Sequence, residues 1–144
     1  MNLEKFNIFP DIRTGTNESI PFENNFFDYL LSWNALNYMG PNLDFEKHIS
    51  ELSRVLKKDG YLVLSIPKKH CFIYHGSENL KEGYQIVRKD PFEIRNGEIL
   101  RMFESQDELE NSLSKYFTNF SFGSIEDDCF GIDNYWYLVV CQKR

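Results

Sequence analysis

The stretch from residue 20 to residue 67 constrains the fold more than any other part of the chain. It reads IPFENNFFDYLLSWNALNYMGPNLDFEKHISELSRVLKKDGYLVLSIP. An apolar run at 26–33 comes first, an amphipathic pattern follows, and a second apolar run at 61–66 ends at Pro67. Two short apolar runs that flank a helix are typical of parallel strands joined by a crossover helix. The stretch therefore predicts a βαβ unit and an α/β fold.

The run at 26–33 contains β-prone aromatic residues and a single charged residue, Asp28. Such a run indicates a strand that is covered on both faces, as in a parallel sheet. The loop after it continues to Gly40 and Pro41, beyond the carboxyl end of the predicted strand. Ligands bind at that edge of open α/β sheets, so we expect this loop to border a ligand site.

The amphipathic segment has the spacing of one helix. Its apolar residues recur at intervals of four, three and four, in a stripe formed by Phe45, Ile49, Leu52 and Leu56. Asn42 or Asp44 can cap its start. Gly60 is predicted to end it in the left-handed conformation, and His48 is predicted to lie on its exposed side.

The first 19 residues are weakly patterned. Residues 6–12 can supply one short strand, although Pro10 suits an edge or a strand start better than a central strand. After Pro67 the pattern is lost, because the apolar residues at 68–104 follow neither a helical nor a strand periodicity. A loop this long inside a domain is usually functional or a cover.

The end of the chain is patterned again. Ser105 and Glu108 form a capping-box pattern that starts a second helix. Apolar runs at 120–125 and 135–141 predict two closing strands. Because only a short polar connection separates them, we expect an antiparallel pair at one edge of the sheet.

Composition narrows the class of protein. The chain has 144 residues, 42% of them hydrophobic, which fits one domain with a real core. A net charge of −6 without a basic block disfavours nucleic-acid binding and attachment to anionic lipid. Three widely spaced cysteines suggest neither a disulfide framework nor a zinc site. We expect a reduced, cytoplasmic protein without a membrane span and without a metal, and interpret Glu126–Asp128 as a solvated turn.

Several fragments resemble class I S-adenosylmethionine-dependent methyltransferases, in particular the methyltransferase type 11-like domain. IPFENNFFD at 20–28 is similar to the turn before the fourth strand of that family, and SWNALNY at 32–38 to the loop after it. LSRVLKKDG at 52–60 and the strand to Pro67 resemble the following helix and fifth strand. The helix at Ser105 and the terminal YWYLVV resemble its last helix and closing hairpin.

One part of the family pattern has no counterpart. The family's cofactor site begins with a strand, a glycine-rich turn and an acidic residue on the second strand, and this chain has no such glycine motif. Gly15 aligns with the later loop after the third strand, where Thr16 replaces the acidic residue usual near the adenine. The resemblance thus implies a three-layer, Rossmann-like methyltransferase fold that is truncated at the N-terminus, with a mostly parallel sheet and a C-terminal antiparallel hairpin.

The resemblance implies that residues 1–144 form a single, partial methyltransferase domain. It has a βαβ core at 20–67, a variable substrate-side segment at 68–104, and the last helix with the closing strands at 105–141. S-adenosylmethionine is the implied cofactor. Its implied contacts are Thr16, Asn17, Ser32, Trp33 and Asn34.

The implied acceptor pocket adds four substrate-binding candidates, which are Tyr38, His70, Arg88 and Arg95. His70 and Tyr38 are weak catalytic candidates, because a histidine can remove the acceptor's proton and a tyrosine can orient the acceptor. Several of the candidate residues also have a purely structural interpretation. Thr16 and Asn17 can form an ordinary turn, Trp33 can be a core aromatic, and a loop histidine is most often solvated.

Two functions follow from the resemblance. The first is methyl transfer from S-adenosylmethionine to a small or medium acceptor, with the remaining part of the site upstream or on another chain. The second is a degenerate, non-catalytic domain that serves as a binding or oligomerisation module. In both cases the strand at 26–33 is left as an open apolar edge, and we expect a homodimer or a partner chain to cover it.

Overall fold

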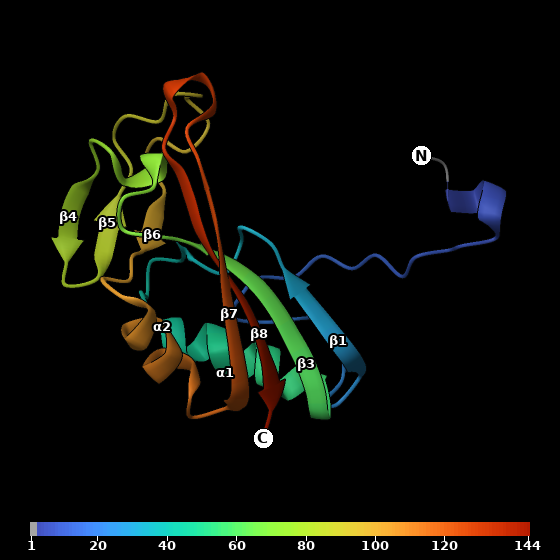
Figure 1. Ribbon diagram of the computed structural model, residues 1–144. Helices are drawn as coiled ribbons and strands as arrows, with labels where there is room; N and C mark the ends of the chain where they lie inside the picture. Colours follow the sequence, from blue (N-terminus) through green and yellow to red (C-terminus); the bar gives the residue numbers. More distant parts are fainter. Residues whose placement is uncertain (1–2) are drawn as a thin grey trace.

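The computed structural model describes residues 3–144, which form two four-stranded sheets and two α-helices (Figure 1). The main sheet has the order β1-β3-β8-β7, with β1 at Phe27–Ser32, β3 at Leu56–Pro67, β8 at Asn134–Lys143 and β7 at Phe117–Asp127. The small sheet has the order β2-β6-β5-β4, with β2 at Tyr38–Met39, β6 at Ile99–Arg101, β5 at Tyr84–Ile86 and β4 at Glu78–Lys81. The helices are α1 at Phe45–Val55 and α2 at Gln106–Leu113, with short 3-10 turns at Leu3–Phe6, Phe72–Tyr74 and Cys129–Gly131.

The predicted βαβ unit is confirmed, since β1 and β3 are parallel and α1 connects them. The predicted antiparallel closing pair is confirmed as well, in β7 and β8. The expectation of a mostly parallel sheet is wrong, because β8 also pairs antiparallel with β3. The main sheet is therefore mixed, with one parallel and two antiparallel pairings.

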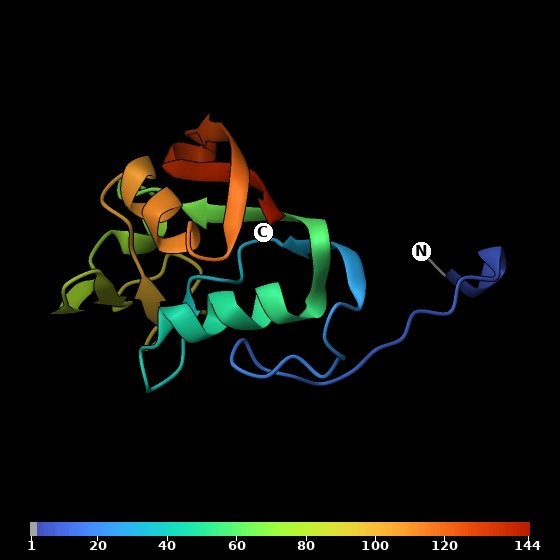
Figure 2. The same ribbon diagram turned by 90° about the horizontal axis from the view of Figure 1, so that it is seen from below.

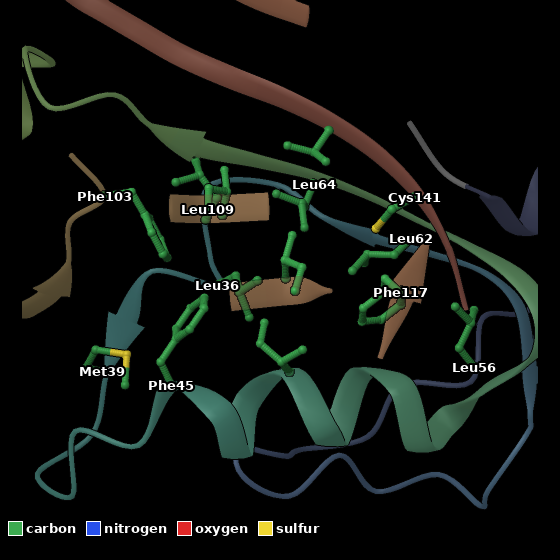
Figure 3. Close-up of a cluster of buried hydrophobic side chains, with 14 residues drawn as sticks. Leu36, Met39, Phe45, Leu56, Leu62, Leu64, Phe103, Leu109, Phe117 and Cys141 are labelled. Carbon is green, nitrogen blue, oxygen red and sulfur yellow. The ribbon is translucent and has the colours of Figure 1, made fainter. Parts of the chain in front are cut away.

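Both helices pack on the same face of the main sheet. One buried cluster contains Phe45 of α1, Leu109 of α2 and Leu64 of β3 (Figure 3). On the opposite face, apolar side chains are open to solvent, with Tyr29 71% and Leu31 70% exposed. Within residues 3–144 the fold thus has a covered and an uncovered sheet face rather than three layers.

The uncovered face corrects the interpretation of the strand at 26–33 as buried on both faces. Tyr29 and Tyr61 stack on this face at 6.0 Å between ring centroids. The expected open edge is present, because β1 is the last strand of its sheet and β3 is its sole partner among the residues described.

The helix α1 starts where the sequence analysis predicts, but it ends earlier than predicted. Asp44 caps the helix by accepting a hydrogen bond from the Lys47 amide at 3.0 Å. The helix ends at Val55, where β3 begins directly, and Asp59 rather than Gly60 takes the left-handed conformation. Gly60 serves close packing instead, since a Cβ atom there would lie 2.9 Å from the Asp28 carbonyl oxygen.

The segment at 68–104 contains more regular secondary structure than its lack of hydrophobic periodicity suggests. It contributes β4, β5 and β6, and a second buried cluster forms around Phe72, Val87 and Leu100. Its strands have three or four residues, too few for an alternation to be seen in the sequence.

Residues 8–14 form an extended arm that leads from the sheets to the 3-10 turn at Leu3–Phe6 (Figure 2). The short strand considered at 6–12 does not form within the described chain, and Phe9 and Ile12 are 75% and 85% exposed. No helix in the described part of the chain is both long enough and apolar enough to cross a membrane.

Candidate functional site

A cavity of about 410 Å³ lies between the loop that follows the arm and the loop that follows β1. Its lining includes Thr16, Asn17, Glu18, Tyr38, Asn42 and His48. Three of the residues singled out from the sequence, Thr16, Asn17 and Tyr38, therefore meet at one site. Met39 and Pro41 add apolar surface to the lining.

The first of these loops is held in a fixed conformation. The Thr16 amide donates to the Ser19 carbonyl at 3.0 Å, and Ser19 returns the bond at 3.1 Å. A Cβ atom at Gly15 would lie 2.4 Å from Cδ of Pro21, so the turn requires glycine there. The Asn17 amide nitrogen Nδ2 lies 3.3 Å from the Tyr38 carbonyl oxygen, which joins the two loops.

Arg54 of α1 anchors the chain between this loop and β1, a role that the sequence did not indicate. Its guanidinium donates to the carbonyls of Ile20 and Phe22 at 2.8 Å each and pairs with Glu51 at 2.8 Å. Glu51 also accepts from the Ile20 amide at 3.0 Å. The hydrogen bond from Arg54 lowers the pKa of Glu51 and keeps its carboxylate ionised.

Tyr38 and Arg95, both predicted to bind substrate, are in direct contact. Arg95 Nε donates to the Tyr38 hydroxyl oxygen at 3.0 Å, and Arg95 Nη1 lies 3.1 Å from Asp90 Oδ1. The Asp90 side chain is fully buried and also accepts from the backbone amides of Ile94 and Arg95. A buried carboxylate thus orients the cation that contacts the cavity wall.

Ser32, Trp33 and Asn34 lie at the carboxyl end of β1, outside the cavity lining. The Asn34 amide donates to Ser65 Oγ at 2.8 Å, and that hydroxyl donates back to Asn34 Oδ1. Asn34 has a φ of 51°, in the left-handed region that asparagine tolerates. Trp33 is 50% exposed, so the alternative of a core aromatic is wrong.

Arg95 does not line the cavity itself and is linked to it through Tyr38, whereas His70 and Arg88 lie apart from it. His70 is exposed in the turn after β3. Arg88 is exposed and pairs with Glu78 at 2.8 Å. Neither residue lines the cavity that contains Thr16 and Tyr38.

His48 is the residue that the sequence interpretation misplaced. It is 1% exposed rather than solvated, and it lines the cavity. Its Nδ1 atom has no hydrogen-bond partner among residues 3–144. Burial lowers the pKa of His48, while the Leu36 carbonyl and Glu18 oppose this shift. The available signal was spacing, because His48 follows Phe45 by three residues and precedes Ile49 by one.

Comparison with known proteins identifies the fold. A family model described as a methyltransferase domain matches residues 2–64. A solved structure of a SAM-dependent methyltransferase from Methanosarcina mazei has a TM-score of 0.66 at 21% identity, over 91% of this chain and 66% of that one. A possible histamine N-methyltransferase from Thermotoga maritima has a TM-score of 0.62 at 20% identity, over 90% of this chain and 62% of that one.

A third solved structure was determined with ligands. It is the 1,6-didemethyltoxoflavin-N1-methyltransferase of Burkholderia thailandensis with 1,6-didemethyltoxoflavin and S-adenosylhomocysteine bound. Its TM-score is 0.62 at 14% identity, over 88% of this chain and 48% of that one. No curated protein matches the chain.

This chain spans less than two thirds of each of these three solved proteins. The match covers about nine tenths of this chain. The family model and the solved structures together show that the chain has the class I S-adenosylmethionine-dependent methyltransferase fold.

Proposed function

We propose that this chain contributes to methyl transfer from S-adenosylmethionine to a small or medium acceptor, together with a glycine-rich segment that it does not contain. The observation that supports this most is the convergence of Thr16, Asn17 and Tyr38 on one cavity beside the carboxyl end of β1. That edge of an open α/β sheet is where ligands bind.

The residues present fit one part of the cofactor. Thr16 and Asn17 offer a hydroxyl and an amide at the cavity, which suits the edge of an adenine ring. Ser32, Trp33 and Asn34 follow β1, where we place the methionine end. When bound, the cofactor supplies an electrophilic methyl group on a sulfonium. The fit is incomplete, because no glycine turn in this chain approaches the ribose and the carboxylate.

The segment at 68–104 is proposed to face the acceptor. Arg95, oriented by Asp90 and joined to Tyr38, is placed to hold a polar or anionic acceptor. Tyr38 can orient the acceptor's nucleophile, and methyl transfer depends mainly on such positioning. His70 and Arg88 remain weaker proposals, since neither lines the cavity and, unlike Arg95, neither is hydrogen-bonded to Tyr38. We propose the cytoplasm as the location.

Calorimetric titration with S-adenosylmethionine and S-adenosylhomocysteine tests the proposal. We expect no binding of the intact cofactor by this chain alone, because the glycine turn is missing. Binding is expected in a chimera that joins this chain to the part of the Methanosarcina mazei protein that it does not cover. The matched control is the same chimera with Asn17→Leu, which we expect to bind at least roughly tenfold more weakly.

The outcomes separate the two functions. Methyl transfer by the chimera supports the enzyme. A folded chimera that binds neither ligand supports the alternative of a degenerate binding or oligomerisation module, which the missing glycine motif and Thr16 in place of an acidic residue favour. Tight binding by this chain alone contradicts the proposed need for a second segment.

We also propose that a second copy or a partner chain covers the edge of β1. Open strand edges pair readily with other chains, and the apolar residues Tyr29 and Leu31 beside this edge are more than two thirds exposed. Sedimentation velocity over a range of concentrations is expected to show a dimer. Lys substitution of Leu31 should shift the dimer toward monomer, and a monomer at high concentration without a partner contradicts self-association.

A further inference from the structure

The arm at residues 8–14 is an extended segment that the rest of the described chain does not cover. Its apolar side chains Ile8, Phe9 and Ile12 are exposed, and Figure 2 shows the arm leading away from the sheets. Among residues 3–144, no other backbone group forms a hydrogen bond with the backbone of residues 8–14. The arm is therefore free to add to the edge of a sheet as an extra strand.

The arm already has the side-chain alternation of a strand. Asp11 and Arg13, two residues apart, lie on the same side and pair at 2.7 Å, while Ile12 between them is open to solvent. Ile8, Pro10 and Ile12 fall on alternate positions and form an apolar row.

Pro10 decides which side of this strand can pair. Proline has no backbone N–H, so it fits an edge strand with its nitrogen directed to solvent. Because backbone N–H groups alternate in direction along a strand, the amides of Phe9 and Asp11 then point to the neighbouring strand, and those of Ile8 and Ile12 point outward.

The edge of β1 offers what such a strand needs. Within residues 3–144, β3 is the sole partner of β1, so the outer side of β1 has no paired strand. Tyr29 and Leu31 are exposed on the uncovered face beside this edge. Aromatic and β-branched side chains on neighbouring strands stabilise each other across the pair. The apolar row of the arm therefore fits beside Tyr29 and Leu31.

The base of the arm favours the edge of another molecule over its own. Arg13 Nη1 donates to the Pro21 carbonyl at 2.8 Å, and Arg13 Cζ lies 4.2 Å from the centroid of the Phe22 ring. These contacts hold the arm in the direction that leads away from the sheets (Figure 2). Folding back onto its own β1 requires a reversal at Arg13 and the loss of both contacts.

The available area suits a dimer. Each copy brings the exposed side chains of Ile8, Phe9, Ile12, Tyr29 and Leu31. Since one covered aromatic side chain buries about 150–250 Å², two reciprocal contacts cover roughly 1,000 Å² of apolar side chain before any backbone is counted. Specific interfaces bury about 1,200–2,000 Å² in total.

We propose that two copies exchange their arms, so that residues 8–13 of one copy pair with the open edge of β1 in the other. Ile8 and Ile12 then lie beside Tyr29 and Leu31 of the second copy. The inference rests on the proposed self-association at this edge and names the segment that mediates it. Reciprocal exchange gives a closed dimer with twofold symmetry.

Ile12→Asp tests the apolar row by sedimentation equilibrium. The dissociation constant of the dimer is expected to rise at least roughly a hundredfold, because each of two apolar contacts receives a carboxylate. Asn7→Asp is the matched control, since it adds the same charge just before the arm at a φ of 54° that aspartate tolerates. Ile12 is exposed in the single chain, so circular dichroism should show both variants folded. An unchanged dissociation constant in Ile12→Asp overturns the proposal.

Mixing two variants separates exchange between copies from every arrangement without the arm. Ile12→Asp and Leu31→Lys each impair both reciprocal contacts of their own dimer. A mixed dimer keeps one contact unaltered, and its other contact brings a carboxylate beside an ammonium group. We expect the mixture to contain more dimer than either variant at the same total concentration. No gain on mixing contradicts arm exchange.

Amide hydrogen exchange in the wild type tests the pairing without any substitution. In the dimer, the Phe9 and Asp11 amides are expected to exchange at least roughly tenfold more slowly than in dilute protein, while the Ile8 and Ile12 amides stay fast. Equal protection in dilute, monomeric protein would show that the arm docks on its own chain and would overturn the exchange.

These results also separate the arm from the edge. A wild-type dimer that Leu31→Lys dissociates and Ile12→Asp does not leaves the association at β1 standing and overturns the role of the arm. A wild type that stays monomeric at high concentration overturns both. Neither measurement requires the cofactor, so the outcome is independent of methyl transfer.

Discussion

Replacing Leu64 with alanine is expected to lower the free energy of unfolding by about 2–5 kcal/mol. Leu64 is fully buried in the cluster that joins α1, α2 and the main sheet (Figure 3). Truncation removes apolar contacts from both helices and leaves a cavity between rigid elements. The total free energy of unfolding of such a domain is about 5–15 kcal/mol. The expected loss is therefore a large share of the total stability. Urea unfolding followed by circular dichroism measures it as a lower midpoint at constant slope.

Leu31→Ala is the matched control. Leu31 has the same side chain on the neighbouring strand β1, but it points to the uncovered face and is 70% exposed. We expect its unfolding free energy to stay within about 0.5 kcal/mol of the wild type in the monomer. Equal losses in the two variants would contradict the assignment of the core to one face of the sheet.

Local patterns predicted the elements that local chemistry determines. Asp44 and Ser105 cap the helices that the sequence assigned to them, since each side chain accepts a backbone N–H three residues on. The chain reversal between β7 and β8 follows from two apolar runs with a short polar connection. These features depend on residues close together in the chain.

Burial depended on parts of the fold that no local pattern contains. The apolar run that contains Tyr29 and Leu31 has the composition of a strand that is covered on both faces. However, one face of β1 has no covering helix within residues 3–144. The end of α1 was misjudged for a related reason. Residues 57–60 look like a helix end, but pairing with β1 extends β3 back to Leu56.

The site was predictable only in its separate parts. Thr16, Asn17 and Tyr38 were singled out from the resemblance, and the structure brings them to one cavity. The contact between Tyr38 and Arg95 spans 57 residues and depends on the register of β2 against β6, which strands of two and three residues do not reveal in sequence. His48 was missed because a polar residue beside a helical stripe usually faces solvent.

Replacing Asp90 with alanine is expected to cost on the order of 2–4 kcal/mol of unfolding free energy. The buried carboxylate accepts from the Arg95 guanidinium and from the backbone amides of Ile94 and Arg95. Alanine leaves these amides without their acceptor and leaves a mostly buried guanidinium, 23% exposed, without its counter-charge. Thermal and urea unfolding of the variant measure the loss.

Glu78→Ala provides the control for Asp90→Ala, because it also removes one carboxylate from an arginine in the same segment. The Glu78 and Arg88 side chains are 63% and 51% exposed, and such surface pairs contribute about 0–1 kcal/mol. A similar loss in both variants would contradict a special role for the buried pair.

A double-mutant cycle with Tyr38→Phe links the Asp90 pair to the cavity. In the wild-type background, the loss of the Tyr38 hydroxyl should lower the free energy of unfolding by about 0.5–1.5 kcal/mol, because Arg95 Nε donates to this hydroxyl at 3.0 Å. In the Asp90→Ala background, Arg95 is no longer held in place, so the same change should cost less. Additive losses would mean that Arg95 reaches Tyr38 without Asp90, and the buried carboxylate would then support the segment at 90–95 without orienting the cavity wall.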